Sequence, residues 1–199
     1  NCSNTTGNLS VCNSTCGDGI FVFSTEGCDD NNTLGGDGCS ATCSVETGFN
    51  CSNTNESTSV CMSVCGDGMV YGNETCDDNN TAAWDGCSAY CAIETGWNCS
   101  NTTGNLSVCN STCGDGIFVF STEGCDDNNT LGGDGCSATC SVETGFNCSN
   151  TNESTSVCMS VCGDGMVYGN ETCDDNNTAA WDGCSAYCAI ETGWNCSNT

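Results

Sequence analysis

The sequence predicts a linear tandem array of small disulfide-rich repeats, a rod made mostly of loops and short β-hairpins with little helix. Three observations predict this fold class. Residues 1–97 and 98–194 are identical, and each unit divides into two related halves that share their cysteine spacing. Cysteine accounts for 25 of the 199 residues, a density typical of disulfide scaffolds. A module of 48 or 49 residues buries too little apolar surface to offset its chain entropy, so disulfides must replace a hydrophobic core.

The repeats define the expected domains. Residues 1–49 form a Cys-rich module A and residues 50–97 a module B, residues 98–146 and 147–194 are their copies, and residues 195–199 begin a further module. The cysteine spacing continues without a Ser/Gly-rich or Pro-rich interruption, so no flexible linker is expected between modules. A semi-rigid rod follows from this organisation.

Each module opens with a polar segment bounded by two cysteines, which predicts a short closed loop. The predicted pairs are Cys2–Cys12, Cys51–Cys61, Cys99–Cys109 and Cys148–Cys158. Each closure contributes roughly 2.5 to 3 kcal/mol on the chain-entropy model. The spacing leaves the pairing among the other four cysteines of a module open. Cys196 is expected to be the first member of another such loop, and a free reactive thiol is the alternative.

The rest of module A is expected to consist of turns and one short strand. Residues 17–19 indicate a tight turn, and the β-branched and aromatic residues 20–23 (69–71 in module B) indicate a strand. Residues 29–38 are rich in Gly, Asn and Asp, which favour turns. Residues 40–43 are compatible with a single helical turn capped by serine. Residues 46–49 then turn the chain into module B, with Phe49 placed to pack at the junction, as Trp97 is at the end of module B.

The motifs resemble a known family. Cys-Gly-Asp-Gly, Cys-Asp-Asp-x-Asn, Gly-Asp-Gly-Cys-Ser-x-x-Cys and Glu-x-Gly-x-x-Cys follow one another in the order typical of the Myxococcus-type cysteine-rich repeat, over nearly the whole chain. The resemblance implies extracellular display in bacterial or protist surface proteins rather than a defined activity. Two departures stand out. Asn31 and Asn79 stand where the family usually has Gly, and Ala83-Trp84-Asp85 replaces Gly-Gly-Asp.

Composition narrows the location and the partners. So many cysteines persist only in an oxidising compartment, which predicts an extracellular protein, secreted or on the cell surface. Metal-thiolate clusters are the alternative, disfavoured because Cys-x-x-Cys pairs and His are absent. The net charge is −26 with no Lys, Arg or His, so nothing can neutralise phosphates and nucleic acid is excluded as a partner. No apolar run is long enough for membrane insertion in this segment.

Asn-x-Ser/Thr is the strongest chemical signal. One 97-residue unit holds nine such sequons among twelve asparagines, and 19 occur in the chain. This excess predicts covalently attached N-linked glycans, with incidental sequons in a polar loop protein as the alternative. Five of the acceptors have Cys in the middle position and are expected to be poor. The favoured acceptors are Asn4, Asn8, Asn13, Asn31, Asn55, Asn73, Asn79, Asn101, Asn105, Asn110, Asn128, Asn152, Asn170 and Asn176.

Clustered carboxylates are the second signal. They lie around fixed turns with no basic residue to pair with, which favours a hard cation with oxygen ligands, and Ca²⁺ is the candidate cofactor. Solvated turn acids that keep the protein soluble are the alternative. The spacing does not match that of an EF-hand. The candidate metal ligands are Asp18, Asp29, Asp30, Asp37, Asp67, Asp77, Asp78 and Asp85.

The residue inventory does not favour an enzyme. Without His or Lys there is no ordinary general base for a Ser or Cys nucleophile, and no catalytic residues are predicted. No cofactor is required. The main hypothesis is a structural subunit that self-assembles into an extracellular N-glycosylated filament or surface appendage, because unchanged repeats present identical surfaces at regular intervals. The alternative is an adhesive or glycan-binding ectodomain stalk of a cell-surface protein, with Trp84 or Trp97 as a sugar platform.

Overall fold

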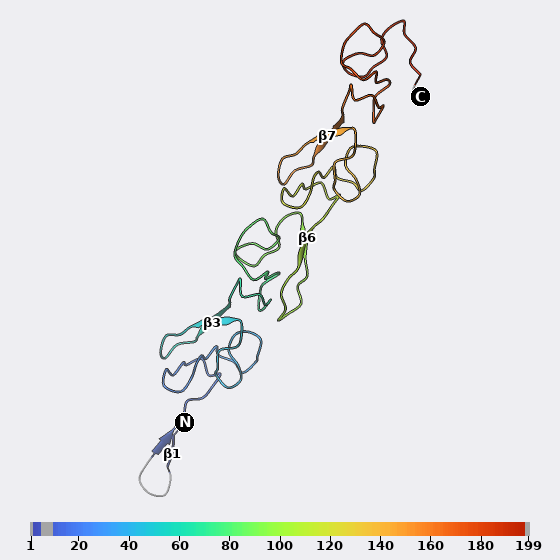
Figure 1. Cartoon of the computed structure of the whole chain (residues 1–199). Coiled ribbons are helices and arrows are strands. Elements are labelled where there is room, and N and C mark those ends of the chain that lie inside the picture. The colour runs from blue at the N-terminus through green and yellow to red at the C-terminus, as the bar shows by residue number, and fades with distance from the viewer. Residues whose placement is uncertain (1, 5–9, 198–199) are drawn as a thin grey trace. The chain divides into compact units, whose positions relative to one another are not determined.

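The computed structural model describes residues 2–4 and 10–197 of the chain. These residues form no helix, and their eight short strands pair as four separate antiparallel hairpins (Figure 1). Turns and bends make up most of the remainder. The predicted fold class of small disulfide-rich repeats with short hairpins is therefore confirmed. The strands are β1 (Cys2–Asn4), β2 (Ser10–Cys12), β3 (Phe49–Ser52), β4 (Val60–Ser63), β5 (Trp97–Cys99), β6 (Cys109–Ser111), β7 (Phe146–Ser149) and β8 (Val157–Ser160).

Disulfides close the hairpins. Cys51 lies directly opposite Cys61 in the β3–β4 register, and the bond between them joins Cα atoms that are 4.0 Å apart. Cys99–Cys109 and Cys148–Cys158 repeat this arrangement, so three of the four short-loop pairs predicted from the sequence are present. For the fourth pair, the side chain of Cys2 lies outside the described residues. Its Cα faces that of Cys12, which is disulfide-bonded.

The other four cysteines of each module form two nested disulfides, which the sequence left open. In the first module Cys16 bonds to Cys43, and the Cys28–Cys39 bond lies within that loop. Cys28 and Cys39 are 0% and 1% exposed, so this disulfide is the centre of the module. The corresponding bonds are Cys65–Cys91 with Cys76–Cys87, Cys113–Cys140 with Cys125–Cys136, and Cys162–Cys188 with Cys173–Cys184.

The core of each module is a cluster of disulfides rather than a layer of apolar side chains. Cys28, Cys39 and Cys43 are buried, and the Cys51–Cys61 hairpin packs against them. The sequence division at residue 49 assigns this hairpin to the following module. A repeating sequence can be divided into modules at any starting residue. The packing of the disulfides, however, groups the hairpin with the four cysteines that precede it.

The chain forms two compact units. One comprises residues 1–94 and 99–109, and the other comprises residues 95–98 and 110–199. The hairpin loop 99–109 belongs with the first unit because the Cys99–Cys109 disulfide packs against Cys76, Cys87 and Cys91. Each unit therefore contains an A-type and a B-type disulfide cluster.

The predicted strand at residues 20–23 is wrong, as is its equivalent at residues 69–71. Alternate N–H groups of the first segment are taken by side chains, because Ile20 donates to Asp18 Oδ1 and Val22 donates to Glu26 Oε2. Phe21 uses both of its backbone groups with one loop, because its N–H donates to Ser57 O and its carbonyl accepts from Glu56 N. The Val22 carbonyl accepts only locally, from the N–H groups of Thr25 and Glu26. A strand ladder therefore cannot form, although the residue types favour one.

The predicted helical turn at residues 40–43 is also wrong. Cys43 has a φ of 53°, in the left-handed region, and its N–H donates to the Ser40 carbonyl to close a single turn. Ser40 Oγ accepts from the Ser44 N–H at 3.1 Å, so the serine caps a turn rather than a helix. The disulfide from Cys43 to Cys16 draws the chain back at this point.

The predicted turn at residues 46–49 is present. Phe49 N–H donates to the Glu46 carbonyl, and Gly48 has a φ of 79° that favours glycine. As expected, Phe49 packs at the junction between A and B, where its ring lies 5.9 Å from that of Tyr71. A Cβ on Gly48 would lie 2.0 Å from Tyr71 Cδ2, so the close approach also requires glycine.

Candidate functional site

Most of the predicted glycan acceptors lie on exposed turns and loops, and Asn110 lies in the short strand β6. Among the favoured acceptors, all those with described side chains are exposed: Asn13, Asn31, Asn55, Asn73, Asn79, Asn101, Asn105, Asn110, Asn128, Asn152, Asn170 and Asn176. Asn8 lies outside the described residues, as does the side chain of Asn4, whose backbone belongs to β1. Every module thus presents acceptor amides to solvent, as the attachment of a bulky glycan requires.

Asn31 and Asn79 explain one departure from the repeat pattern. Both have a φ of 70°, a left-handed conformation that glycine adopts freely and that asparagine tolerates better than most residues. The repeat family that the sequence resembles usually has glycine at these positions. Asparagine preserves the backbone conformation there and adds an exposed amide within a sequon.

A buried carboxylate organises each module. Asp29 is 0% exposed, and its Oδ2 accepts from the N–H groups of Gly17 (2.8 Å) and Asp18 (3.3 Å). Its Oδ1 accepts from Gly19 (2.8 Å) and Asn31 (3.0 Å). These four N–H donors occupy the lone-pair positions that a carboxylate offers. The Gly-Asp-Gly turn is therefore an anion nest for the protein's own side chain.

Asp29 also connects the turn to the hairpin loop. Its own N–H donates to Ser59 Oγ at 2.8 Å, and the Ser59 N–H donates to the Asp29 carbonyl. Burial raises the pKa of Asp29, but the backbone N–H donors lower it, and the result lies below the ordinary value of 3.8. The pKa of Asp174 is lowered by the same balance. These aspartates are therefore anions stabilised by the fold.

Module B repeats the nest. Asp77 is 0% exposed, its oxygens accept from Gly66, Gly68 and Asn79 at 2.7–2.9 Å, and its N–H donates to Ser107 Oγ. Among the predicted metal ligands, Asp29 and Asp77 thus have their oxygens engaged by backbone. Asp18 and Asp67 each accept a hydrogen bond from the N–H two residues later, which forms a local turn.

The remaining predicted ligands come together in pairs. Burial, together with the proximity of Asp37, raises the pKa of Asp30, and burial and Asp85 act in the same way on Asp78. Asp30 Oδ1 and Asp78 Oδ1 are buried and accept no hydrogen bond. Asp127 has the same unpartnered oxygen and a pKa raised by burial and by Asp134. The structure therefore brings together Asp30 with Asp37 and Asp78 with Asp85, two oxygen-rich pairs that have no basic residue to neutralise them.

The cysteines do not offer metal ligands in the described part of the chain, apart from Cys196. Sulfur atoms of Cys65 and Cys91 lie near Asp77, but they are bonded to each other. Cys196 is free, and its Sγ lies 3.7 Å from the Gly183 carbonyl oxygen. Cys99 Sγ has the equivalent contact with Gly86 in its own module at 3.3 Å. Cys196 thus has the environment that Cys99 has as the first cysteine of its hairpin. That Cys196 pairs with a second cysteine to close a similar loop stays a prediction.

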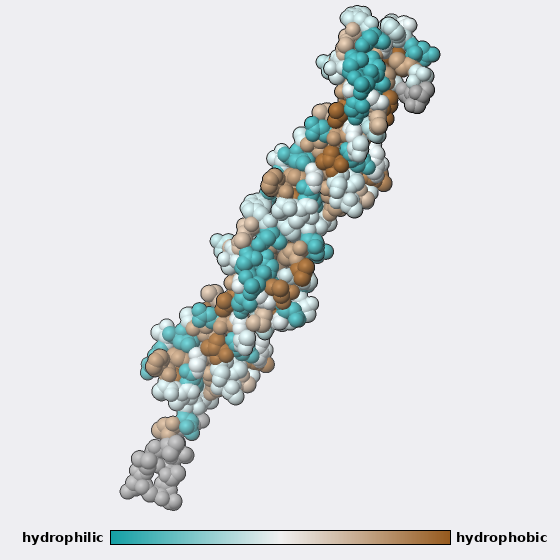
Figure 2. Space-filling model, in the orientation of Figure 1, coloured by the Kyte–Doolittle hydropathy of each residue, from teal (hydrophilic) through white to brown (hydrophobic). Residues whose placement is uncertain are grey.

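Sequence reasoning missed three features. Glu46 Oε2 accepts from the N–H groups of Gly36 and Gly38, and the recurrence of Glu-Thr-Gly was the available signal. A groove of about 630 Å³, lined among others by Phe49, Asn73 and Tyr90, follows the A-to-B junction of the first unit. Many large apolar side chains are exposed, and Figure 2 shows small brown patches among teal and white residues.

The described residues contain no helix long and apolar enough to cross a membrane. In comparisons with known proteins, a family model described as a domain of unknown function, DUF4215, matches the chain four times in tandem, at residues 1–44, 46–92, 94–141 and 143–189. The match supports a cysteine-rich repeat domain, and the Myxococcus-type name stays a resemblance. No curated protein and no solved structure matches the chain.

Proposed function

The chain belongs to the DUF4215 family, and from this premise we propose that it is a structural subunit of an extracellular, N-glycosylated filament or surface appendage built from tandem disulfide-stapled repeats. The role is architectural rather than catalytic. The observation that carries the proposal is the exposure of the acceptor asparagines in every module. Together with disulfide cores, which persist in oxidising compartments, this exposure suits a protein that passes through the secretory pathway.

Glycosylation would cover parts of the protein surface that the chain itself leaves exposed to solvent. The attachment is an N-glycosidic bond, formed when the asparagine Nδ2 displaces the leaving group at the anomeric carbon of an activated oligosaccharide and loses one proton. Sugars at the exposed acceptors would shield a protein whose buried apolar residues are mostly cysteines. They would also separate chains that carry a net charge of −26.

Self-assembly rests on the repetition. Residues 1–97 and 98–194 are identical, so a contact made by one unit is available again on the other. Repeated identical surfaces support heterologous, open association, which generates helical filaments. Exposed apolar side chains that recur in both units, such as Leu34 and Leu131 at 71% exposure each, are candidate contacts between chains.

Calcium binding at the acid pairs stays a prediction. Asp30 with Asp37 and Asp78 with Asp85 supply hard oxygen ligands, and each pair includes a buried oxygen without a hydrogen bond. Isothermal titration of the metal-free chain with Ca²⁺ would test it, with Asp30→Asn/Asp78→Asn as the variant. Equal heats from both proteins would contradict binding at these pairs.

A glycan-binding stalk is the second candidate, and one observation favours it. Trp84 and Trp181 have φ values of 75° and 79°, which is strained for a bulky residue, yet they are 56% and 88% exposed. Tyr90 and Tyr187 in the same modules are 90% exposed. Strained, exposed aromatics suit contact with a sugar or with another cell.

Cryo-electron microscopy and glycopeptide mass spectrometry of the chain from a glycosylating secretory host would test the proposal. We expect ordered polymers, with sugar at most of the favoured acceptors. Monomeric chains with unmodified asparagines would contradict the filament. Glycan-array binding that is lost in Trp84→Ala/Trp181→Ala would instead favour the stalk.

A further inference from the structure

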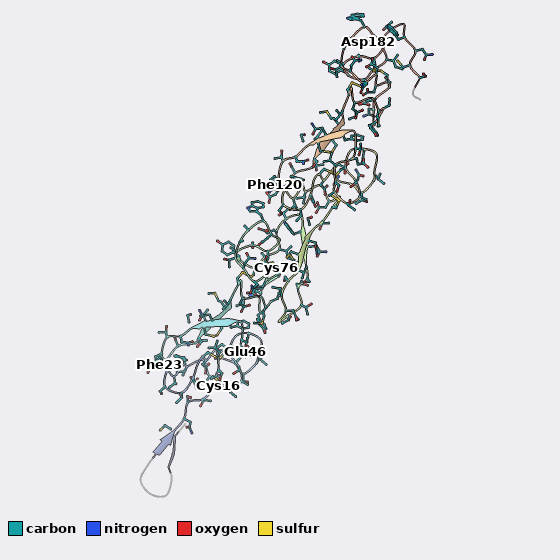
Figure 3. All side chains as sticks on the ribbon, viewed as in Figure 1. Cys16, Phe23, Glu46, Cys76, Phe120 and Asp182 are labelled. Atoms are coloured by element: carbon teal, nitrogen blue, oxygen red, sulfur yellow. A yellow bond between two sulfur atoms is a disulfide. The ribbon has the colours of Figure 1, made fainter. Side chains whose placement is uncertain are left out.

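Phe23 and Phe120 occupy an unusual environment in the A-type modules. Each side chain is 81% exposed, although a phenylalanine gains stability mainly by leaving water. The phenylalanine two residues earlier in each module does not share this exposure, since Phe21 is 3% and Phe118 is 5% exposed. In Figure 3 the labelled Phe23 and Phe120 lie at the outer edge of their modules. The exposed rings therefore require an explanation other than packing within the module.

The backbone at Phe23 is tied to a predicted glycan acceptor. Phe23 N–H donates to Asn55 Oδ1 at 3.3 Å, and Phe120 N–H donates to Asn152 Oδ1 at 3.2 Å. Two backbone hydrogen bonds between Phe21 and the loop at Glu56 and Ser57 hold the two segments in register. The Phe23 N–H engages the Asn55 oxygen, so the amide nitrogen Nδ2, the atom that carries a glycan, remains available on a side chain that is exposed, as Phe23 is.

Module B supplies an internal comparison, because the same backbone hydrogen bonds occur there without the exposed phenylalanine and without the acceptor asparagine. Val70 N–H donates to the Asn105 carbonyl and Gly104 N–H donates to the Val70 carbonyl, as in the bonds made by Phe21. By this alignment Gly72 stands at the position of Phe23, and Thr103 at the position of Asn55. The exposed ring thus occurs in the module type that has the acceptor, and both are replaced together in the other.

We propose that Phe23 and Phe120 are packing platforms for the first sugar of N-glycans attached to Asn55 and Asn152. The proposal rests on the glycosylation proposed above and adds to it a specific partner for the sugar. The C–H groups of a pyranose ring are weakly positive and fit the negative face of an aromatic ring. Covering the ring would remove apolar surface from water and would orient the glycan over residues 21–23 and 54–57 of the hairpin loop.

The competing occupant of the ring is a second chain in the filament. The two occupants predict different effects of replacing Phe23. If the sugar covers Phe23, the NMR shifts of the sugar depend on the phenylalanine ring even in an isolated chain. If a second chain covers Phe23, the sugar shifts do not depend on the ring, and only the assembly of chains changes when the ring is removed. The test therefore uses the full chain at a concentration where it is monomeric.

The experiment compares five proteins made with ¹³C-labelled sugar and trimmed to one N-acetylglucosamine per site. They are the native chain, Phe23→Leu/Phe120→Leu, Phe23→Ala/Phe120→Ala, Ser57→Ala/Ser154→Ala and Asn55→Gln/Asn152→Gln. Ser57→Ala is the matched control because it destroys the sequon but leaves the Asn55 amide in place, and Ser57 Oγ bonds only locally, to the Thr54 carbonyl. Glycopeptide mass spectrometry measures occupancy at each asparagine, and two-dimensional NMR measures sugar shifts.

We expect the sugars at Asn55 and Asn152, identified by their loss in Ser57→Ala/Ser154→Ala, to resonate upfield of the other sugars through the ring current. That upfield shift should disappear in the leucine variants, which retain an apolar side chain and guard against misfolding. Occupied Asn55 and Asn152 with unchanged shifts in the leucine variants would overturn the inference and leave glycosylation standing. Sugar at other asparagines but not at Asn55 and Asn152 would also overturn the inference and leave glycosylation standing. Unmodified asparagines throughout would overturn both proposals.

Discussion

The carboxylate of Asp29 should stabilise its module more than any other single polar side chain. In the variant Asp29→Ala the N–H groups of Gly17, Gly19 and Asn31, now bonded at 2.8 to 3.0 Å, lose their acceptor, as does that of Asp18 at 3.3 Å. Each hydrogen bond to a charged group contributes about 1.5 to 3 kcal/mol. Water will replace some of them because the donors are only partly buried, so we expect a local loss of about 3 kcal/mol rather than the sum.

That loss corresponds to roughly 10²-fold faster amide exchange in peptides spanning residues 16–31. Hydrogen exchange with reduction at quench would measure it, and the identical sequence around Asp126 serves as an internal control, since the substitution separates the two peptides by mass. Asp29→Asn keeps one oxygen acceptor and should give an intermediate rate. In Asp29→Ala, an exchange rate at residues 16–31 that is within twofold of the rate at residues 113–128 would refute the reasoning.

The same carboxylate predicts a pH dependence. The pKa of Asp29 in the folded protein lies below its ordinary value, so its contribution to stability is present above the unfolded pKa of about 3.9 and is lost as pH falls through the folded pKa. Exchange at residues 16–31 should therefore accelerate only in strongly acidic solution. In Asp29→Ala this acid sensitivity should be reduced.

Two other predictions concern the A-to-B junction and the acid pairs. Gly48→Ala should destabilise the junction by about 2 to 3 kcal/mol, because a Cβ would clash with Tyr71. Gly36→Ala has open space around the new Cβ and should cost about 1 kcal/mol, from the positive φ alone. Near-ultraviolet circular dichroism on heating would compare the two variants, and an equal loss of signal in both would count against this prediction. The pKa of Asp30 is raised by burial and by Asp37, so its contribution to stability is present below the unfolded pKa and is lost as pH rises through the folded pKa. Exchange near the Asp30–Asp37 turn, corrected for intrinsic rates, should slow from pH 7 to about 4, and an unaltered profile in Asp30→Asn would show the cause to lie elsewhere.

Much of the fold could be predicted from the sequence because its constraints are local. Two cysteines ten residues apart, such as Cys51 and Cys61, can close only a short loop, and the hairpin between β3 and β4 follows from that closure. Glycine at position 48 indicated a turn, and it has the positive φ that such a turn uses. The sequons were predicted to carry N-linked glycans, which requires exposed side chains, and the favoured acceptors whose side chains are described are exposed.

The residue types misled where hydrogen bonding decided the outcome. Residues 20–23 have the composition of a strand, but side-chain oxygens of Asp18 and Glu26 take the N–H groups that a strand would need. Asp18 lies only two residues before Ile20, so this local competition was in principle detectable. The partner of Phe23 is Asn55, 32 residues away, and no local pattern indicates it.

Asp29 and Asp30 show most clearly what only the tertiary structure decides. They are adjacent and chemically identical, and the sequence marked both as candidate cation ligands. In the fold, Asp29 enters a nest of N–H groups from the Gly-Asp-Gly turn, which lowers its pKa, while burial and the proximity of Asp37 raise the pKa of Asp30. The sequence by itself determined the disulfide-closed hairpins and the exposed sequons, because both depend on short stretches of chain. The fate of each carboxylate depends on which distant donors and charges surround it, and the nested Cys16–Cys43 and Cys28–Cys39 disulfides bring those groups together.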